Sequence, residues 1–235
     1  MKALITIRRY LSNKPIMFVL MYRAFGRNKN LLVSKNTDIV IEGYPRSGNT
    51  FSVLAFQYAQ KKEITIAHHL HAAAQVIWAI KKSIPVVVLI RTPIEAVVSF
   101  VIRDEHVSID EAIDEYIKFY ESILPYKNDV VIGEFELVTN DYGKIIESIN
   151  KKYNLNYLPF KHTVSNQEEV FKMVQHVGKN ESNNILDERK VARPSDERSV
   201  IKTRLMPQIL SEKYCGKINK ANDIYTAFTT KSNQN

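Results

Sequence analysis

The chain has 235 residues, of which 45% are hydrophobic and 25% are charged, with only seven glycines and eight prolines. This composition excludes a collagen-like, a disordered or a low-complexity protein, and the length suffices for one domain with a sizeable core. Cys215 is the sole cysteine, which excludes an intrachain disulfide and a thiolate zinc cluster and favours a cytoplasmic location. No run of 18 apolar residues is present, so we expect no ordinary transmembrane helix.

The net charge of +8 is concentrated in one part of the chain. Eight lysines and arginines and no acid precede Asp38, whereas the remainder carries 25 residues of each sign. We therefore divide the chain into a basic, apolar arm (1–36), a main domain (37–228) and a polar tail (229–235) that we expect to fray. Three interpretations of the arm stay open: a helix docked on the domain, a helix lying on an anionic membrane surface, or an organelle-targeting peptide.

Strand and helix patterns alternate after the arm. Short β-branched or apolar runs predict strands over 38–42, 63–67, 85–90 and 129–135, and the second-last of these is fully apolar, as in a central parallel strand. Helical periodicity predicts helices over 49–62, 71–82, 94–101, 109–124, 142–153, 167–177 and 195–214, with Pro207 kinking or splitting the last one. The alternation predicts an α/β fold with a central, mostly parallel sheet of about four to five strands flanked by helices.

The loop after the first strand has the composition of a phosphate-binding loop. Gly43-Tyr-Pro-Arg-Ser-Gly-Asn-Thr50 lies between a strand and a helix, where backbone N–H groups and the helix N-terminus face a bound anion. Arg46 adds a positive charge, and the side chains of Ser47, Asn49 and Thr50 add hydrogen-bond donors. The glycine spacing matches a Walker A loop, but Asn49 stands where that loop requires lysine. An ordinary strand-to-helix turn is the alternative.

Two motifs, each following its own predicted strand, lie about 45 residues apart. The first is Tyr44-Pro-Arg-Ser-Gly-Asn-Thr-Phe51 and the second is Arg91-Thr-Pro-Ile-Glu-Ala-Val-Val-Ser99. Together they resemble the motifs of the PAPS-dependent sulfotransferases, whose donor is 3′-phosphoadenosine 5′-phosphosulfate (PAPS). In that family a Tyr-Pro-Lys-Ser-Gly-Thr-Thr-Trp loop binds the 5′-phosphosulfate, and an Arg-x-Pro…Ser segment binds the 3′-phosphate. The resemblance covers about residues 38–138 well and the remainder loosely. It implies a P-loop-NTPase-like, three-layer fold.

The resemblance also implies which residues bind the donor. Arg46 takes the place of the family lysine, and it can neutralise the leaving phosphate bidentately although it does not readily hand over a proton. Phe51 replaces the loop tryptophan and keeps an aromatic face for the base, while Phe135 lies in a segment similar to the one near the adenine. A basic cluster over 189–195 corresponds in position to the segment that closes over the 3′-phosphate. The implied cofactor-binding residues are Arg46, Ser47, Gly48, Asn49, Thr50, Phe51, Arg91, Ser99, Phe135 and Arg193.

Three histidines, His68, His69 and His71, follow the second predicted strand. The residues alone leave open a general base, zinc ligands, or side chains that cap a helix or pack. In the family the general base is a histidine in an Ile-x-x-His-Leu pattern, and Ile66-Ala-His-His-Leu70 is similar, which implies His69 as the base. Sulfuryl transfer requires the acceptor hydroxyl to lose its proton as it attacks sulfur, a task that suits an imidazole. The chemistry requires no metal, and Glu42 is the next candidate for the base.

The sequence is therefore interpreted as a PAPS-dependent sulfotransferase in which Arg46 and His69 are catalytic. It would move a sulfuryl group to a hydroxyl or amine acceptor on a glycan, a lipid or a small molecule. We expect a cytoplasmic protein that contacts an anionic membrane through residues 1–36 and binds no nucleic acid. The alternatives are a P-loop kinase or nucleotide-binding protein, which Asn49 and the Arg91/Ser99 pair disfavour, and a non-catalytic basic module that binds a membrane or nucleic acid. The charged run from Arg103 to Glu105 is expected to form a solvated helix end.

Overall fold

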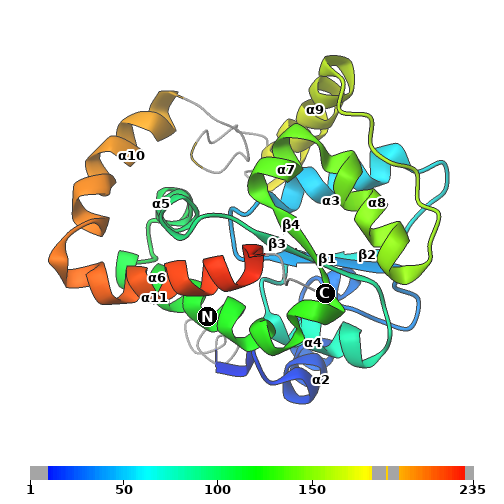
Figure 1. Cartoon of the computed structure of the whole chain (residues 1–235), viewed down its shortest axis with the longest axis horizontal. Coiled ribbons are helices and arrows are strands. Elements are labelled where there is room, and N and C mark those ends of the chain that lie inside the picture. Colours follow the sequence, from blue (N-terminus) through cyan, green and yellow to red (C-terminus); the bar gives the residue numbers. More distant parts are fainter. Residues whose placement is uncertain (1–9, 182–188, 190–195, 231–235) are drawn as a thin grey trace.

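The computed structural model describes residues 10–181, 189 and 196–230. Within them, four strands form one sheet (Figure 1): β1 (Ile39–Gly43), β2 (Ile66–His68), β3 (Val86–Ile90) and β4 (Val131–Glu134). The strand order is β2-β1-β3-β4 and every pairing is parallel. All five residues of β1 and of β3 are buried, as their β-branched and apolar composition predicts for the centre of a parallel sheet.

Helices follow each strand and connect it to the next. The helices between β1 and β4 are α3 (Asn49–Ala59), α4 (Ala73–Lys81), α5 (Pro93–Arg103) and α6 (Ile109–Ile123), the last continuing into the 3-10 segment η2 (Leu124–Asp129). After β4 come α7 (Phe135–Asn140), α8 (Tyr142–Tyr153), α9 (Val164–Glu181), α10 (Asp196–Ile209) and α11 (Glu212–Thr229). Before the sheet lie α2 (Pro15–Phe25) and the 3-10 turn η1 (Lys29–Leu31).

The helices form two layers on the two faces of the sheet. Ile39, Ile41 and Leu89 belong to a buried apolar cluster with residues of α3, α8 and α9, whereas Val40 and Val88 belong to a second cluster with residues of α4, α5, α6 and α11. Alternate side chains of one strand point to opposite faces, so the two clusters are the two cores of a three-layer fold (Figure 1). The predicted P-loop-NTPase-like α/β fold is confirmed.

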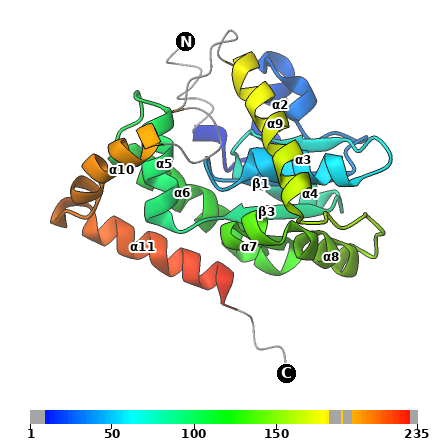
Figure 2. The same ribbon diagram turned by 90° about the horizontal axis from the view of Figure 1, so that it is seen from above.

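The C-terminal helices differ from the sequence prediction. A helix over 195–214 was expected to be kinked or split at Pro207. It is split, but a few residues later: α10 passes through Pro207 to Ile209, and the helix is interrupted at Leu210–Ser211 before α11 begins. Helix α11 then runs to Thr229 because an apolar stripe with a three-to-four-residue spacing packs against the body; its buried members are Tyr214, Ile218, Ala221, Ile224 and Phe228. Figure 2 shows α10 and α11 beside α5 and α6, which they contact.

Helix α2 of the arm packs on the main domain. Phe18 and Val19 are buried in a small cluster with Leu70 and Ala74 at the start of α4, so the docked-helix interpretation of the arm describes this contact correctly. No helix in the described part of the chain is long and apolar enough to cross a membrane.

Candidate active site

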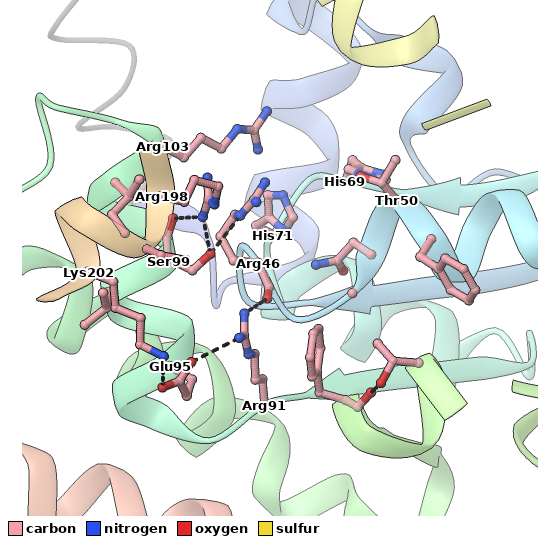
Figure 3. A pocket seen from close by; sticks show the side chains of 18 of the residues that line it. Arg46, Thr50, His69, His71, Arg91, Glu95, Ser99, Arg103, Arg198 and Lys202 are labelled. Carbon is pink, nitrogen blue, oxygen red and sulfur yellow. Dashed lines mark hydrogen bonds and ion pairs between the residues drawn. The ribbon is translucent and has the colours of Figure 1, made fainter. Parts of the chain in front are cut away.

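A cavity of about 490 Å³ lies where the loops that follow the strands meet α5, α7 and α10 (Figure 3). Its walls come from the β1–α3 loop, the β2–α4 loop and the β3–α5 loop, together with side chains of α3, α5, α7, α9 and α10. In parallel α/β sheets, ligands bind outside the carboxyl ends of the strands. The cavity therefore occupies the expected place for a substrate.

The β1–α3 loop ends at the N-terminus of α3, where its backbone is tightly constrained. Gly48 has a φ of +90°, and a Cβ at this position would lie 3.1 Å from Val138 Cγ1 and 3.5 Å from the ring of Phe135. Arg46 also adopts a left-handed conformation, with a φ of +69°. Helix α3 begins at Asn49, so its first-turn N–H groups face the cavity, as in phosphate-binding loops.

The side chains of Ser47 and Asn49 make contacts within the protein that support this loop. Ser47 is fully buried: its hydroxyl lies 3.3 Å from that of Tyr120, its N–H donates to the Tyr44 carbonyl, and its side chain lies outside the cavity lining. Asn49 lines the cavity but its amide donates to the Tyr44 carbonyl at 3.0 Å. The side chain of Ser47, which the sequence suggested as a cofactor ligand, thus braces the loop against α6.

One side of the cavity is cationic. Arg46, Arg91, Arg103, Arg198 and Lys202 line it, and we call these five residues the cation wall. The hydroxyl of Ser99 is the centre of this wall: it accepts hydrogen bonds from Arg46 Nε at 3.1 Å and from Arg198 Nη2 at 2.7 Å (Figure 3). Arg46 therefore belongs to the β1–α3 loop by its backbone and to the cation wall by its side chain.

Arg91 is held by three different contacts. It donates to the Arg46 carbonyl at 3.3 Å and to Glu95 at 3.2 Å, and its guanidinium lies 4.1 Å from the centre of the Phe135 ring. Lys202 donates to the other oxygen of Glu95 at 2.6 Å. Among the described residues that line the cavity, Glu95 is the single acid, so the five cations of the wall exceed the acids beside them.

The cations repel one another. Burial lowers the pKa of Arg198, and the nearby Arg91 and Arg103 lower it further. Burial also lowers the pKa of Arg91, against an opposing effect of Glu95. Buried cations that repel each other in this way are stabilised by a bound anion, because an anion removes the repulsion and accepts charge-assisted hydrogen bonds.

Helix geometry explains why α5 and α10 supply this wall. Glu95, Ser99 and Arg103 are spaced four residues apart on α5, and Arg198 and Lys202 are four apart on α10, so each set lies on one face of its helix. Arg103 was expected at a solvated helix end, but it lines the cavity because its face of α5 is the one that carries Ser99.

Thr50, His69 and His71 line another part of the cavity, which we call the histidine wall. His69 Nε2 lies 3.1 Å from Thr50 Oγ1, and its Nδ1 lies 2.6 Å from Nδ1 of His68. His71 Nδ1 lies 2.7 Å from the Gly43 carbonyl. Burial is the main cause that holds the pKa of His69 well below 6.5, and the neighbouring histidines and Arg103 lower it further. Burial lowers the pKa of His68 to about 4.

Glu42 holds the backbone of the histidine wall in place. Its carboxylate is fully buried and accepts hydrogen bonds from the N–H groups of Leu70 (2.7 Å) and His71 (3.0 Å) and from Gln75 Nε2 (2.8 Å). His69 and His71 have φ values of +57° and +47°, a conformation that costs free energy in a non-glycine residue. Glu42 was the second candidate for the base, but its oxygens are engaged in supporting this loop.

Two tyrosines of α6 support the cavity from behind. The Tyr120 hydroxyl donates to the Leu89 carbonyl at 2.7 Å and accepts from the Tyr44 N–H at 3.3 Å. The Tyr116 hydroxyl donates to the Arg91 carbonyl at 2.8 Å. These bonds fix the ends of β1 and β3, from which the two sequence motifs start.

The structure brings most of the sequence-predicted residues together. The cavity lining contains Arg46, Gly48, Asn49, Thr50, Phe51, His69, Arg91, Ser99 and Phe135. Phe51 is largely buried among Tyr142, Phe160 and Phe171, so only the edge of its side chain reaches the cavity. Arg193 lies outside the described residues. Arg198 and Lys202 were missed as site residues, and their spacing on one helix was the signal available. Glu42 was named only as the second candidate for the base, and its support of the histidine loop was not foreseen.

A second cavity of about 390 Å³ adjoins the first. The two share His71 and Arg103, and Ser12, Phe100 and Glu115 contribute to the lining of the second. Among the residues that the structure describes, no group of three or more His, Cys, Asp or Glu side chains is placed to hold a metal ion.

Comparison with solved structures finds five matching chains, one of which is described here. A crystal structure of mouse sulfotransferase SULT7A1 complexed with PAP is similar at a TM-score of 0.47 and 12% sequence identity, over 89% of this chain and 92% of that chain. No protein family matches the chain, and no curated protein sequence matches it.

Proposed function

We propose that this protein is a PAPS-dependent sulfotransferase that moves a sulfuryl group to a hydroxyl or amine acceptor. The observation that carries the proposal is the pairing of the cation wall with the histidine wall in one cavity. The reaction needs both walls. The cation wall would bind the donor, which carries phosphate groups at two positions, and the histidine wall would take the proton that the acceptor must lose. The tight β1–α3 loop and the Arg91…Ser99 segment, which resemble the two family motifs, contribute to the same cavity.

The donor fits the cationic side by its charge. The 5′-phosphosulfate would lie at the N-terminus of α3, where first-turn N–H groups and the helix dipole favour an anion. The 3′-phosphate would lie at Ser99, with Arg91 and Arg198 supplying its positive partners. Arg46, which reaches Ser99 from the loop, would stabilise charge on the phosphate that departs. Phe135 stacks on Arg91 and lines the same cavity.

His69 would act as the general base, and His68 would set its tautomer. The two Nδ1 atoms are 2.6 Å apart, so one proton is shared between them. When His69 Nδ1 carries that proton, Nε2 has a lone pair and can accept a proton from the acceptor. The acceptor oxygen or nitrogen then bonds to sulfur, the bond from sulfur to the phosphate oxygen breaks, and PAP leaves with that electron pair.

The kinase alternative lacks the features that its chemistry requires. A Walker A loop places a lysine on the β- and γ-phosphates, but here Asn49 stands at that position and donates to the Tyr44 carbonyl. A nucleoside triphosphate has no 3′-phosphate, so it would leave the Ser99 end of the cation wall unused.

Nucleotide binding separates the two alternatives directly. We expect PAP to raise the melting temperature with or without magnesium, and ADP to have a much smaller effect, because each charge-assisted contact to the 3′-phosphate contributes about 1.5–3 kcal/mol. Equal shifts with PAP and ADP, or a shift that needs magnesium, would contradict the proposal. A negative result with both nucleotides would favour the non-catalytic alternative.

A further inference from the structure

Helix α2 is apolar on two opposite faces, and only one of them is covered. Phe18 and Val19 pack against the start of α4, while Ile16, Met17 and Leu20 are 62%, 54% and 61% exposed. Phe25, the last residue of the helix, is 77% exposed. A helix that is apolar all round is normally covered on all sides. Figure 1 shows α2 at the outer edge of the molecule, beyond α4.

The three residues of the uncovered face are close together in space. Leu20 lies about one turn after both Ile16 (i, i+4) and Met17 (i, i+3), which places the three side chains on one side of the helix. The buried residues Phe18 and Val19 lie on the opposite side. Helix α2 therefore docks on α4 and also exposes an apolar face, because the two faces consist of different residues.

The border of this face is positively charged. Arg23 is exposed in the last turn of α2, and Arg27 and Lys29 are exposed just beyond its end. No acid precedes Asp38 in the sequence. An exposed apolar face bordered by cations is the arrangement of helices that lie in the interface of a membrane with anionic lipids.

We propose that the outer face of α2, formed by Ile16, Met17 and Leu20, docks this protein on an anionic membrane surface. The charge distribution selects this occupant. A second copy of the chain docked through the same face would bring two clusters of cations together without an acid from either arm, and like charges across an interface are unfavourable. Anionic headgroups, by contrast, neutralise the cations while the acyl region covers the apolar residues.

Vesicle sedimentation with matched variants tests the proposal. The full chain is mixed with vesicles of phosphatidylcholine alone or with phosphatidylglycerol added. We expect binding to the mixed vesicles that falls with salt, since surface attraction is screened within a Debye length, and little binding to phosphatidylcholine. The variant R23Q/R27Q/K29Q should bind on the order of 100-fold more weakly, at about fivefold for each cation removed.

A second variant removes the apolar contribution. I16Q/L20Q should bind at least tenfold more weakly while keeping all the charges, because about 0.8 kcal/mol, or fourfold, is lost for each CH₂ group withdrawn from the membrane. The matched controls are K61Q/K62Q/K151Q for charge and L158Q/L210Q for exposed apolar residues, which all lie outside the arm. Both controls should bind as the unmodified chain does.

Several results would overturn the proposal. They are an intact chain that ignores phosphatidylglycerol vesicles at low salt, binding that neither arm variant weakens, and a dimer in solution that I16Q/L20Q dissociates, which would mean that a second copy covers the face. The melting temperature of each variant shows that it is folded. The response to PAP is measured separately, so failure of membrane docking and failure of the sulfotransferase proposal are distinguished.

Discussion

The cation wall and the histidine wall face the same cavity, and burial lowers the pKa of residues on both. On the cation wall a guanidinium starts from a pKa above 12, so Arg91 and Arg198 keep their charge despite the shift. On the histidine wall an imidazole starts from 6.5, so the same cause leaves His69 neutral at pH 7. One desolvated cavity thus presents both fixed positive charge and a neutral proton acceptor, because the residue types differ.

The largest expected effect concerns the histidine wall. His69→Ala should lower turnover by about 10²–10⁴-fold, because a positioned general base contributes that much, while PAP binding should be retained. Turnover is measured as transfer from labelled PAPS to a panel of hydroxyl acceptors that includes 4-nitrophenol, and PAP binding by titration calorimetry. Turnover reports on the histidine wall and PAP binding reports on the cation wall, so in this variant only turnover should change.

His68→Ala is the matched control for that variant. His68 bonds to Nδ1 of His69 but is not part of the cavity lining, so its loss should reduce turnover less than the loss of His69. If His68→Ala were inactive and His69→Ala active, the general base would be His68, and the assignment of His69 as the base would be wrong.

The next effect concerns the cation wall. Arg198→Ala should weaken PAP binding by about 10–150-fold, which corresponds to the 1.5–3 kcal/mol of a charge-assisted contact, and should weaken ADP binding much less. Arg204→Ala removes the same charge from an exposed position on the same helix and should leave both affinities unchanged. Equal losses for PAP and ADP with Arg198→Ala would place this arginine away from the 3′-phosphate.

The fold and the two loops that bear the motifs could be predicted from the sequence because their signals are local. The apolar runs of β1 and β3, the glycines of the first loop and the proline at the start of α5 each constrain the backbone within a few residues. The strand ends then meet at one edge of the sheet by topology, which brings His69, Arg46 and Arg91 together without further information.

Arg198 and Glu42 could not be assigned because their roles depend on packing between distant segments. Arg198 reaches Ser99, 99 positions earlier in the chain, only because α10 packs on α5, and the local sequence Asp196-Glu-Arg-Ser is typical of a solvated helix start. Glu42 supports residues 28 and 29 positions later. A carboxylate within a fully buried strand requires hydrogen-bond donors, but the sequence does not show which groups supply them.

A smaller effect tests the neutral state of the histidine wall. The pKa of His68 falls from 6.5 to about 4 on folding, so the unfolded chain binds more protons between these values and the free energy of unfolding decreases as pH falls through that window. The loss at pH 4 should be on the order of 2 kcal/mol, after allowance for partial exposure.

Thermal unfolding between pH 4 and 8 measures this linkage. His68→Gln should flatten the acid limb of the stability curve, whereas His106→Gln, at an exposed site, should leave it unchanged. An identical acid limb in His68→Gln and in the unmodified protein would show that His68 is not held neutral by burial.

The smallest expected effect concerns the contact that joins the cation wall to an aromatic ring. Phe135→Leu removes the face on which Arg91 lies at 4.1 Å but keeps an apolar side chain of similar size. A cation–π contact contributes about 0.5–1 kcal/mol at partly exposed sites, so PAP affinity should fall by about two- to fivefold, with turnover at saturating PAPS nearly unchanged. Phe171→Leu, in the aromatic cluster around Phe51, is the control for loss of a ring elsewhere in the lining and should change PAP affinity less. A loss in Phe135→Leu as large as that of Arg198→Ala would mean that the ring contacts the nucleotide itself, which would extend the donor site from the cation wall onto α7.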